Sequence, residues 1–170
     1  TFAGNFWSSF FHNSLLFLDI FIYGQWIHTN SDRIVVDFLR YERDELRFSV
    51  VKVIAAAAHA NREVAPEERK LYELFIESTD LSSEQRKEAQ KIFEEGFAVE
   101  DFNISSENSW ILKKFFLEMS ILTIWADRKV EQEEMDFLKK FCHYLDVSDD
   151  DLENSMIGIE GFVLEQWEHL

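Results

Sequence analysis

The chain has 170 residues, a formal net charge of −16 and 46% hydrophobic residues, with five glycines, one proline and one cysteine. Its length and hydrophobic fraction are enough for one domain with its own core. The negative charge disfavours binding to nucleic-acid phosphates or to an anionic membrane surface. The single cysteine, Cys142, excludes an internal disulfide and favours a reducing compartment.

Residues 1–30 form an aromatic-rich segment that we expect to be helical. The first 28 residues contain many Phe and Trp side chains and one formally charged residue, Asp19. Their densest apolar run, residues 15–27, is shorter than the roughly 20 residues of a membrane-spanning helix, so no transmembrane span is expected. Three interpretations stay open: a helix packed on the core of the bundle, which base rates favour, a docking surface for a missing region, and an interfacial membrane helix.

Residues 31–170 are expected to form one helical domain, because helix-favouring residues are abundant and Gly and Pro are rare. Ser31 or Asp32 can cap the first helix of this domain, and Pro66 suits the first turn of the next. Ser82 with Gln85 forms a capping-box pattern. The expected helices run from 31 to 60 with a bend near 41–44, from 66 through 75, from 82 to 96, from 105 or 106 through 124, from 131 to 144, a short acidic one from 148, and a last one around 162–167.

Part of the chain is repeated internally. Shifting the sequence by 66 positions places residues 59–82 on residues 125–148 without a gap, so that Asn61 lies on Asp127. Each copy has an apolar helix, a short polar turn, a helix with acidic first residues, and an Asp-x-Ser cap. We therefore predict an all-α fold, a single bundle of about seven to eight helices built from two related helical-hairpin halves, at about 48–98 and 114–157.

The two copies, AAAAHANREVAPEERKLYELF and LTIWADRKVEQEEMDFLKKF, resemble the signature of the tellurite-resistance TerB-like family over about residues 46–156. In that signature a helix of small residues ends in Ala-Asp-Gly, followed by a hydrophobic residue and a pair of acidic residues. The resemblance implies an all-helical fold, a link to tellurite resistance and stress response, and binding of metal ions or of membrane proteins. This chain departs from the signature at Asn61, which replaces the Asp, and at Arg62 and Arg128, which replace the Gly.

The second turn contains the candidate ligands for a divalent cation. Asp127, Glu131 and Glu134 offer the carboxylate oxygens that a hard cation needs. The competing interpretation is structural, because an Asp before a helix caps backbone amides and early Glu residues complement the helix dipole, and base rates favour it. The weaker equivalents in the first turn are Asn61, Glu67 and Glu68.

The densest negative patch is a candidate interaction site, formed by Asp149, Asp150, Asp151 and Glu153. These side chains complement the dipole of a helix N-terminus, and they could also meet a basic partner. The five histidines are isolated from metal-binding motifs, and no nucleophile elbow, Gly-rich phosphate loop or catalytic triad spacing is present. We therefore predict that the chain is not an enzyme.

The leading hypothesis is a non-enzymatic TerB-like binding or scaffold module of a larger stress-response or membrane-associated protein. Its expected partner is a protein, either a membrane protein or another region of the same full-length chain, and no nucleic acid. The alternative is a divalent-cation-binding module, with that cation as the one candidate cofactor, and an unrecognised enzyme is the weakest hypothesis. The expected location is the cytoplasm, including the inner face of a membrane.

Overall fold

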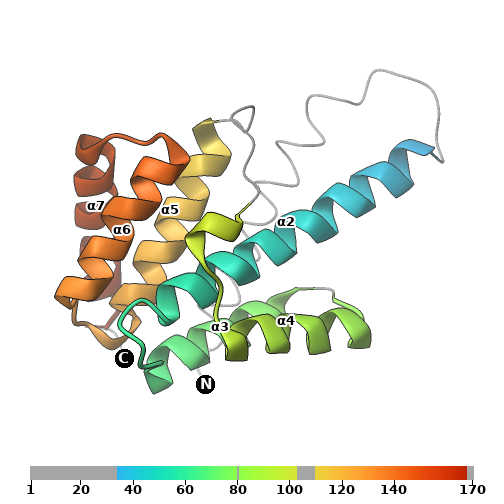
Figure 1. The fold of residues 1–170 in the computed structure, drawn as a ribbon, viewed down its shortest axis with the longest axis horizontal. Coiled ribbons are helices and arrows are strands. Elements are labelled where there is room, and N and C mark those ends of the chain that lie inside the picture. Colours follow the sequence, from blue (N-terminus) through green and yellow to red (C-terminus); the bar gives the residue numbers. More distant parts are fainter. Residues whose placement is uncertain (1–33, 80, 103–109, 168–170) are drawn as a thin grey trace.

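The computed structural model describes residues 34–79, 81–102 and 110–167. These residues form six α-helices and two short 3-10 helices and contain no strand, which confirms the all-α prediction (Figure 1). The elements are α2 (Ile34–Ala58), α3 (Pro66–Ser78), α4 (Ser83–Glu95), η1 (Val99–Asp101), α5 (Trp110–Ile124), η2 (Trp125–Asp127), α6 (Gln132–Leu145) and α7 (Asp149–Trp167).

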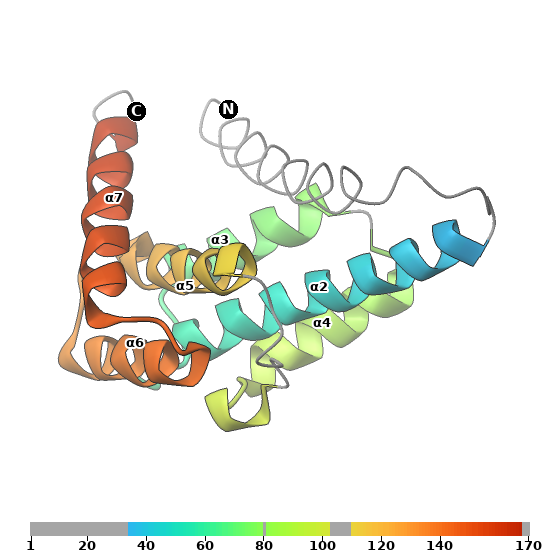
Figure 2. The same cartoon turned by 90° about the horizontal axis from the view of Figure 1, so that it is seen from above.

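Helix α2 lies at the centre of the described fold. It packs against α5 and α4 and also contacts α3 and α6, while α3 contacts η2 and α5, and α5 contacts α6 and α7. Figures 1 and 2 show α5, α6 and α7 gathered near the C-terminal end of α2, with α4 running beside α2. None of the described helices is long and apolar enough to cross a lipid bilayer.

Small and aromatic side chains let these helices approach closely. Residues 55–58, all alanine, are buried at the end of α2, where a narrow helix surface admits its neighbours. Four phenylalanines from four different helices fill the core: Phe75, Phe93, Phe116 and Phe141. Helix α5 is buried along much of its length, and it satisfies its buried hydroxyls internally, because Ser120 donates to the carbonyl of Leu117 over 2.7 Å and Thr123 to that of Met119 over 2.8 Å.

The helix ends follow the sequence signals. Pro66 is the first residue of α3, and Ser82 caps α4 through a reciprocal pair of hydrogen bonds with Gln85. Gly96 ends α4 with a φ of 75°, and a Cβ there would lie 3.1 Å from the ring of His59. The same imidazole donates from Nε2 to the carbonyl oxygen of Phe93 over 2.8 Å, which joins the end of α2 to α4.

Two details of the predicted helices are corrected. Helix α2 is one helix through residues 41–44, where a bend was expected. The predicted helices from 148 and around 162–167 are one continuous helix, α7, so the described residues contain six α-helices, one fewer than the seven predicted for residues 31–170. Gly158 and Gly161 lie within α7, because a helical Gly costs only about 1 kcal/mol and leaves the hydrogen bonding intact. The predicted cap at 105 or 106 and the segment 1–30 lie outside the described residues.

Candidate functional site

The two turns aligned by the 66-residue shift have the same backbone conformation. Arg62 and Arg128 are both in the left-handed region, with φ of 69° and 65°. The amide of Arg62 donates to the carbonyl of His59 over 3.1 Å, and that of Arg128 donates to Trp125 over 3.0 Å. Each turn therefore accommodates arginine at a position where glycine is favoured, at a conformational cost on the order of 1 kcal/mol.

The helix after each turn begins with the same capping arrangement. The Glu68 carboxylate accepts a hydrogen bond from the backbone amide of Ala65 over 2.8 Å, and Glu134 accepts one from Glu131 over 2.7 Å. Both glutamates are almost completely buried, with side chains 2% and 3% exposed. The acidic residues at these positions thus serve the backbone, as the structural interpretation predicts.

The residues before the two arginines hold the turns in the same way. The Asn61 side-chain oxygen accepts from the amide of Glu63 over 3.0 Å, and Asp127 accepts from Lys129 over 2.8 Å. This bond to the amide two residues along the chain is the Asx turn, which Asn and Asp form equally well. The difference between Asn61 and Asp127 therefore has no consequence inside each turn.

The difference matters where the two turns meet. The Nδ2 group of Asn61 donates to Glu131 Oε2 and to Glu134 Oε1, over 3.2 Å in both cases. The first turn thus supplies hydrogen-bond donors to the carboxylates of the second, across about seventy residues of chain. We call the group formed by Asn61, Glu68, Asp127, Glu131 and Glu134 the twin-turn cluster.

Burial governs the charge of this cluster. Burial raises the pKa of the Glu68 carboxyl to about 8, because the loss of solvent outweighs the Ala65 amide that favours the ionised form, and the negative charges of Glu134 and Asp127 add to the rise. Burial also raises the pKa of Glu134, opposed by the amide of Glu131. Near neutral pH the cluster therefore retains a proton that separate carboxyls in water would lose.

The side chains of the twin-turn cluster are engaged in hydrogen bonds within and between the two turns. Within the described ranges, no group of three or more His, Cys, Asp or Glu side chains could hold a metal ion. Asn61 presents its amide protons to the oxygens of Glu131 and Glu134 that a cation would need. Glu67 is exposed in the first turn of α3, outside the cluster.

The acidic patch lies in the first turns of α7. Ser148 Oγ accepts from the amide of Asp151 over 3.2 Å and donates to its carboxylate over 2.5 Å, which confirms the predicted cap. Asp149, Asp150 and Asp151 occupy the first turn, where they complement the helix dipole.

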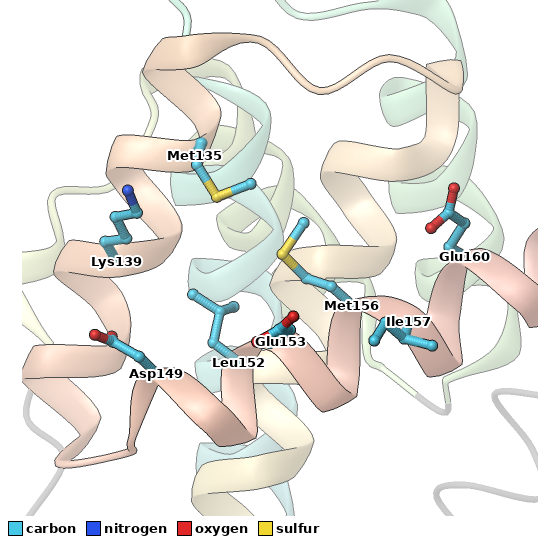
Figure 3. A pocket seen from close by; sticks show the side chains of 8 residues that line it. All are labelled: Met135, Lys139, Asp149, Leu152, Glu153, Met156, Ile157 and Glu160. Carbon is cyan, nitrogen blue, oxygen red and sulfur yellow. The ribbon is translucent and has the colours of Figure 1, made fainter.

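A groove of about 370 Å³ lies between α6 and α7 (Figure 3). Its apolar side chains are Met135 from α6 and Leu152, Met156 and Ile157 from α7, and its charged side chains are Lys139, Asp149, Glu153 and Glu160. The groove brings Asp149 and Glu153 of the predicted patch together with an apolar surface and leaves Asp150 and Asp151 out.

Sequence reasoning missed Met156 and Ile157, which fall at the expected boundary between two helices. The four-residue spacing of Leu152 and Met156 was the available signal for Met156.

The fold and the site define an acidic, all-helical module. Its buried carboxyl groups hydrogen-bond to its own turns, and an apolar groove is open to solvent. No family model matches the chain, and no solved structure matches it significantly. The chain is 30% identical over 122 residues to the co-chaperone protein DjlA of Vibrio parahaemolyticus, over 67% of this chain and 43% of that protein. DjlA of Vibrio vulnificus (strain YJ016) is 30% identical over 122 residues, and that of Vibrio cholerae is 28% identical over 124. The chain spans less than half the length of these curated relatives.

These relatives correct the TerB-like assignment. The similar proteins are named co-chaperones, and no family model supports the TerB-like resemblance, so the prediction of a TerB-like scaffold linked to tellurite resistance was wrong. The alternative function, a divalent-cation-binding module, is overturned with it. The physical reason is that the residues of the motif cap helices and form Asx turns. The motif therefore indicates two helices joined by a capped turn, a geometry that does not define a function.

Proposed function

We propose that this chain is a non-catalytic, partner-binding region of a co-chaperone. The observation that carries the proposal is the similarity to proteins named co-chaperone protein DjlA, which extends over two thirds of the chain. A co-chaperone acts through contact with another protein, and the acidic, apolar-lined groove between α6 and α7 is a surface suited to such a contact.

Two features support the absence of catalysis in this proposal. The carboxyl groups of Glu68 and Glu134 accept backbone hydrogen bonds and are almost completely buried, so neither is accessible to a substrate. The Cys142 thiol is 1% exposed, and burial raises its pKa to about 11, which disfavours the thiolate that a nucleophile requires. The proposal places the chain in the cytoplasm, where a free thiol persists.

The test is a chaperone-assisted refolding assay with the full-length protein that contains this chain and a chaperone purified from the same cells. We expect the protein to bind the chaperone and to raise the rate or yield of refolding of a denatured enzyme. Without the chaperone it should have no effect, which separates a co-chaperone from a protein that only prevents aggregation. An unrelated helical protein of similar negative charge controls for charge alone. A full-length protein that neither binds the chaperone nor changes refolding would overturn the proposal.

A further inference from the structure

The groove between α6 and α7 has an exposed apolar surface that the fold itself leaves uncovered. Ile157 is 61% exposed, the largest exposure among the large hydrophobic side chains that the structure describes. Met156 on α7 and Met135 on α6 are half-buried beside it. Flexible, polarisable methionine side chains adapt to the shape of a partner, and they are common on surfaces that bind peptide helices.

The dimensions of the groove suit a helix. Its residues on α7 extend from Asp149 to Glu160, which at 1.5 Å per residue corresponds to roughly 16 Å, or about three helical turns. Figure 3 shows Met135, Leu152 and Met156 between the two helices and Ile157 farther along α7, with Asp149 and Glu160 toward opposite ends of the α7 segment. A helix laid along this part of α7 would also contact Met135 and Lys139 of α6, as in helix-in-groove recognition.

The charged side chains around the groove indicate which charge a bound partner helix should carry. Asp149, Glu153 and Glu160 are exposed carboxylates, whereas Lys139 is the one basic side chain in the lining. None of the three carboxylates forms an ion pair with another described residue. An incoming helix with basic flanks would therefore meet complementary charge along the length of the groove.

We propose that the α6–α7 groove binds an amphipathic helix of the partner protein, with apolar side chains against Met156 and Ile157 and basic side chains against Glu153 and Glu160. This inference rests on the proposed co-chaperone function and assigns it a surface. The chain's own first 28 residues contain no Lys or Arg and so lack the complementary charge. A second copy of the chain, at −16, would meet like charge.

Binding of designed peptides to the full-length protein tests the charge selection. The first probe is a labelled helical peptide with leucines on one face and lysines on the other, and the second carries glutamates in place of the lysines. We expect saturable binding of the lysine peptide and at least about tenfold weaker binding of the glutamate peptide. The double variant E153K/E160K should reverse this preference, whereas Glu88→Lys on α4, an equally exposed site outside the groove, should not. Equal binding of both peptides, or an equal effect of Glu88→Lys, would overturn the proposal.

A second pair of variants tests the apolar contact. Ile157→Asp should weaken lysine-peptide binding about tenfold, although it adds a negative charge that a purely electrostatic contact would favour. Asn154→Asp adds the same charge at an exposed α7 position outside the groove and should leave binding within about twofold. The proposal fails if the two variants behave alike, if neither peptide binds, or if sedimentation shows that a second copy occupies the groove.

The chaperone assay separates this inference from the function on which it rests. If the full-length protein stimulates the chaperone and Ile157→Asp does so equally well, the groove assignment is wrong and the co-chaperone function stands. If the lysine peptide binds the groove but the full-length protein has no effect with the chaperone, the co-chaperone function is wrong.

Discussion

The side-chain amide of Asn61 donates a hydrogen bond to the buried carboxylate of Glu134 over 3.2 Å, across the contact between the two equivalent turns. Asp127, at the position equivalent to Asn61, has no N–H to donate and instead contributes a negative charge that raises the pKa of both Glu68 and Glu134. One turn therefore relieves the electrostatic repulsion in the twin-turn cluster, and the other adds to it.

Asn61→Asp should destabilise the protein. The variant keeps the acceptor for the amide of Glu63 but removes the donor to Glu131 and Glu134 and adds a carboxylate beside them. We expect a loss of about 1–3 kcal/mol in the free energy of unfolding at pH 8, measured by urea denaturation, and a smaller loss at pH 5, where protonation reduces the repulsion. Asp127→Asn is the opposite change in the equivalent turn and should not destabilise. Equal losses for the two variants would contradict this account.

Glu68 should make the protein less stable as the pH rises. Its pKa is about 8 in the folded state, against an ordinary value of 4.5, so the folded state holds a proton that the unfolded state releases between these pH values. The free energy of unfolding should therefore fall from pH 4.5 to pH 8, by about 1.4 kcal/mol for each pH unit by which the folded-state pKa exceeds that of the unfolded chain.

Glu68→Gln should flatten this pH dependence and stabilise the protein at pH 8, because a neutral amide can still accept from Ala65. Glu67→Gln removes the same charge from the exposed neighbouring position in the first turn of α3 and serves as the control. Urea denaturation at several pH values measures both. The same pH slope in the two variants would show that burial of Glu68 is not the cause.

Arg62 should tolerate glycine better than alanine. Its φ of 69° strains any residue with a Cβ, whereas glycine adopts this conformation freely. We expect Arg62→Gly to be more stable than Arg62→Ala by about 1 kcal/mol. The exposed helical residue Lys87 is the control. There Lys87→Ala should be more stable than Lys87→Gly by about 1 kcal/mol, because glycine is unfavourable inside a helix. Thermal or urea unfolding of the four variants gives the comparison, and alanine more stable at both positions would refute it.

Cys142 should resist alkylation in the folded protein. The thiol is 1% exposed, and its pKa of about 11 leaves little thiolate at pH 8. Its reaction with iodoacetamide should be more than about a hundredfold slower than that of a cysteine introduced at the exposed Asn154 in a Cys142→Ala background. Labelling of both at full rate in denaturant is the control. Rapid labelling of native Cys142 would show that the core around it opens readily.

Local signals were enough to predict most of the helices. Pro66, the Ser82–Gln85 box and Ser148 act on backbone amides within a few residues, so their effect is visible in a short stretch of sequence. The end of the chain was less predictable, because Gly158 and Gly161 weaken a helix without ending it, and the packing of α7 on α5 and α6 decides that it continues.

The candidate site was predicted in its parts but not in its assembly. The 66-residue shift identified Asn61 and Asp127 as equivalent, but it could not show that Asn61 faces Glu131 and Glu134, because that contact depends on how the two hairpins pack. The groove was missed for the same reason, since it needs Met135 and Met156 from two helices. Function was misassigned because the repeated motif consists of residues that stabilise turns.

The presence of both turns in one polypeptide has a consequence for what mutation can achieve here. In a symmetric dimer of a single hairpin, each residue would occur twice, so an Asn that donates to the opposite carboxylates would also replace the Asp on the other side. In a single chain that contains both turns, the two positions are encoded separately, so a mutation changes the residue in one turn and leaves the other turn unchanged. Asn61 and Asp127 illustrate this: equivalent positions of the two turns carry different side chains, and the Asn61 amide donates to the carboxylates of the opposite turn.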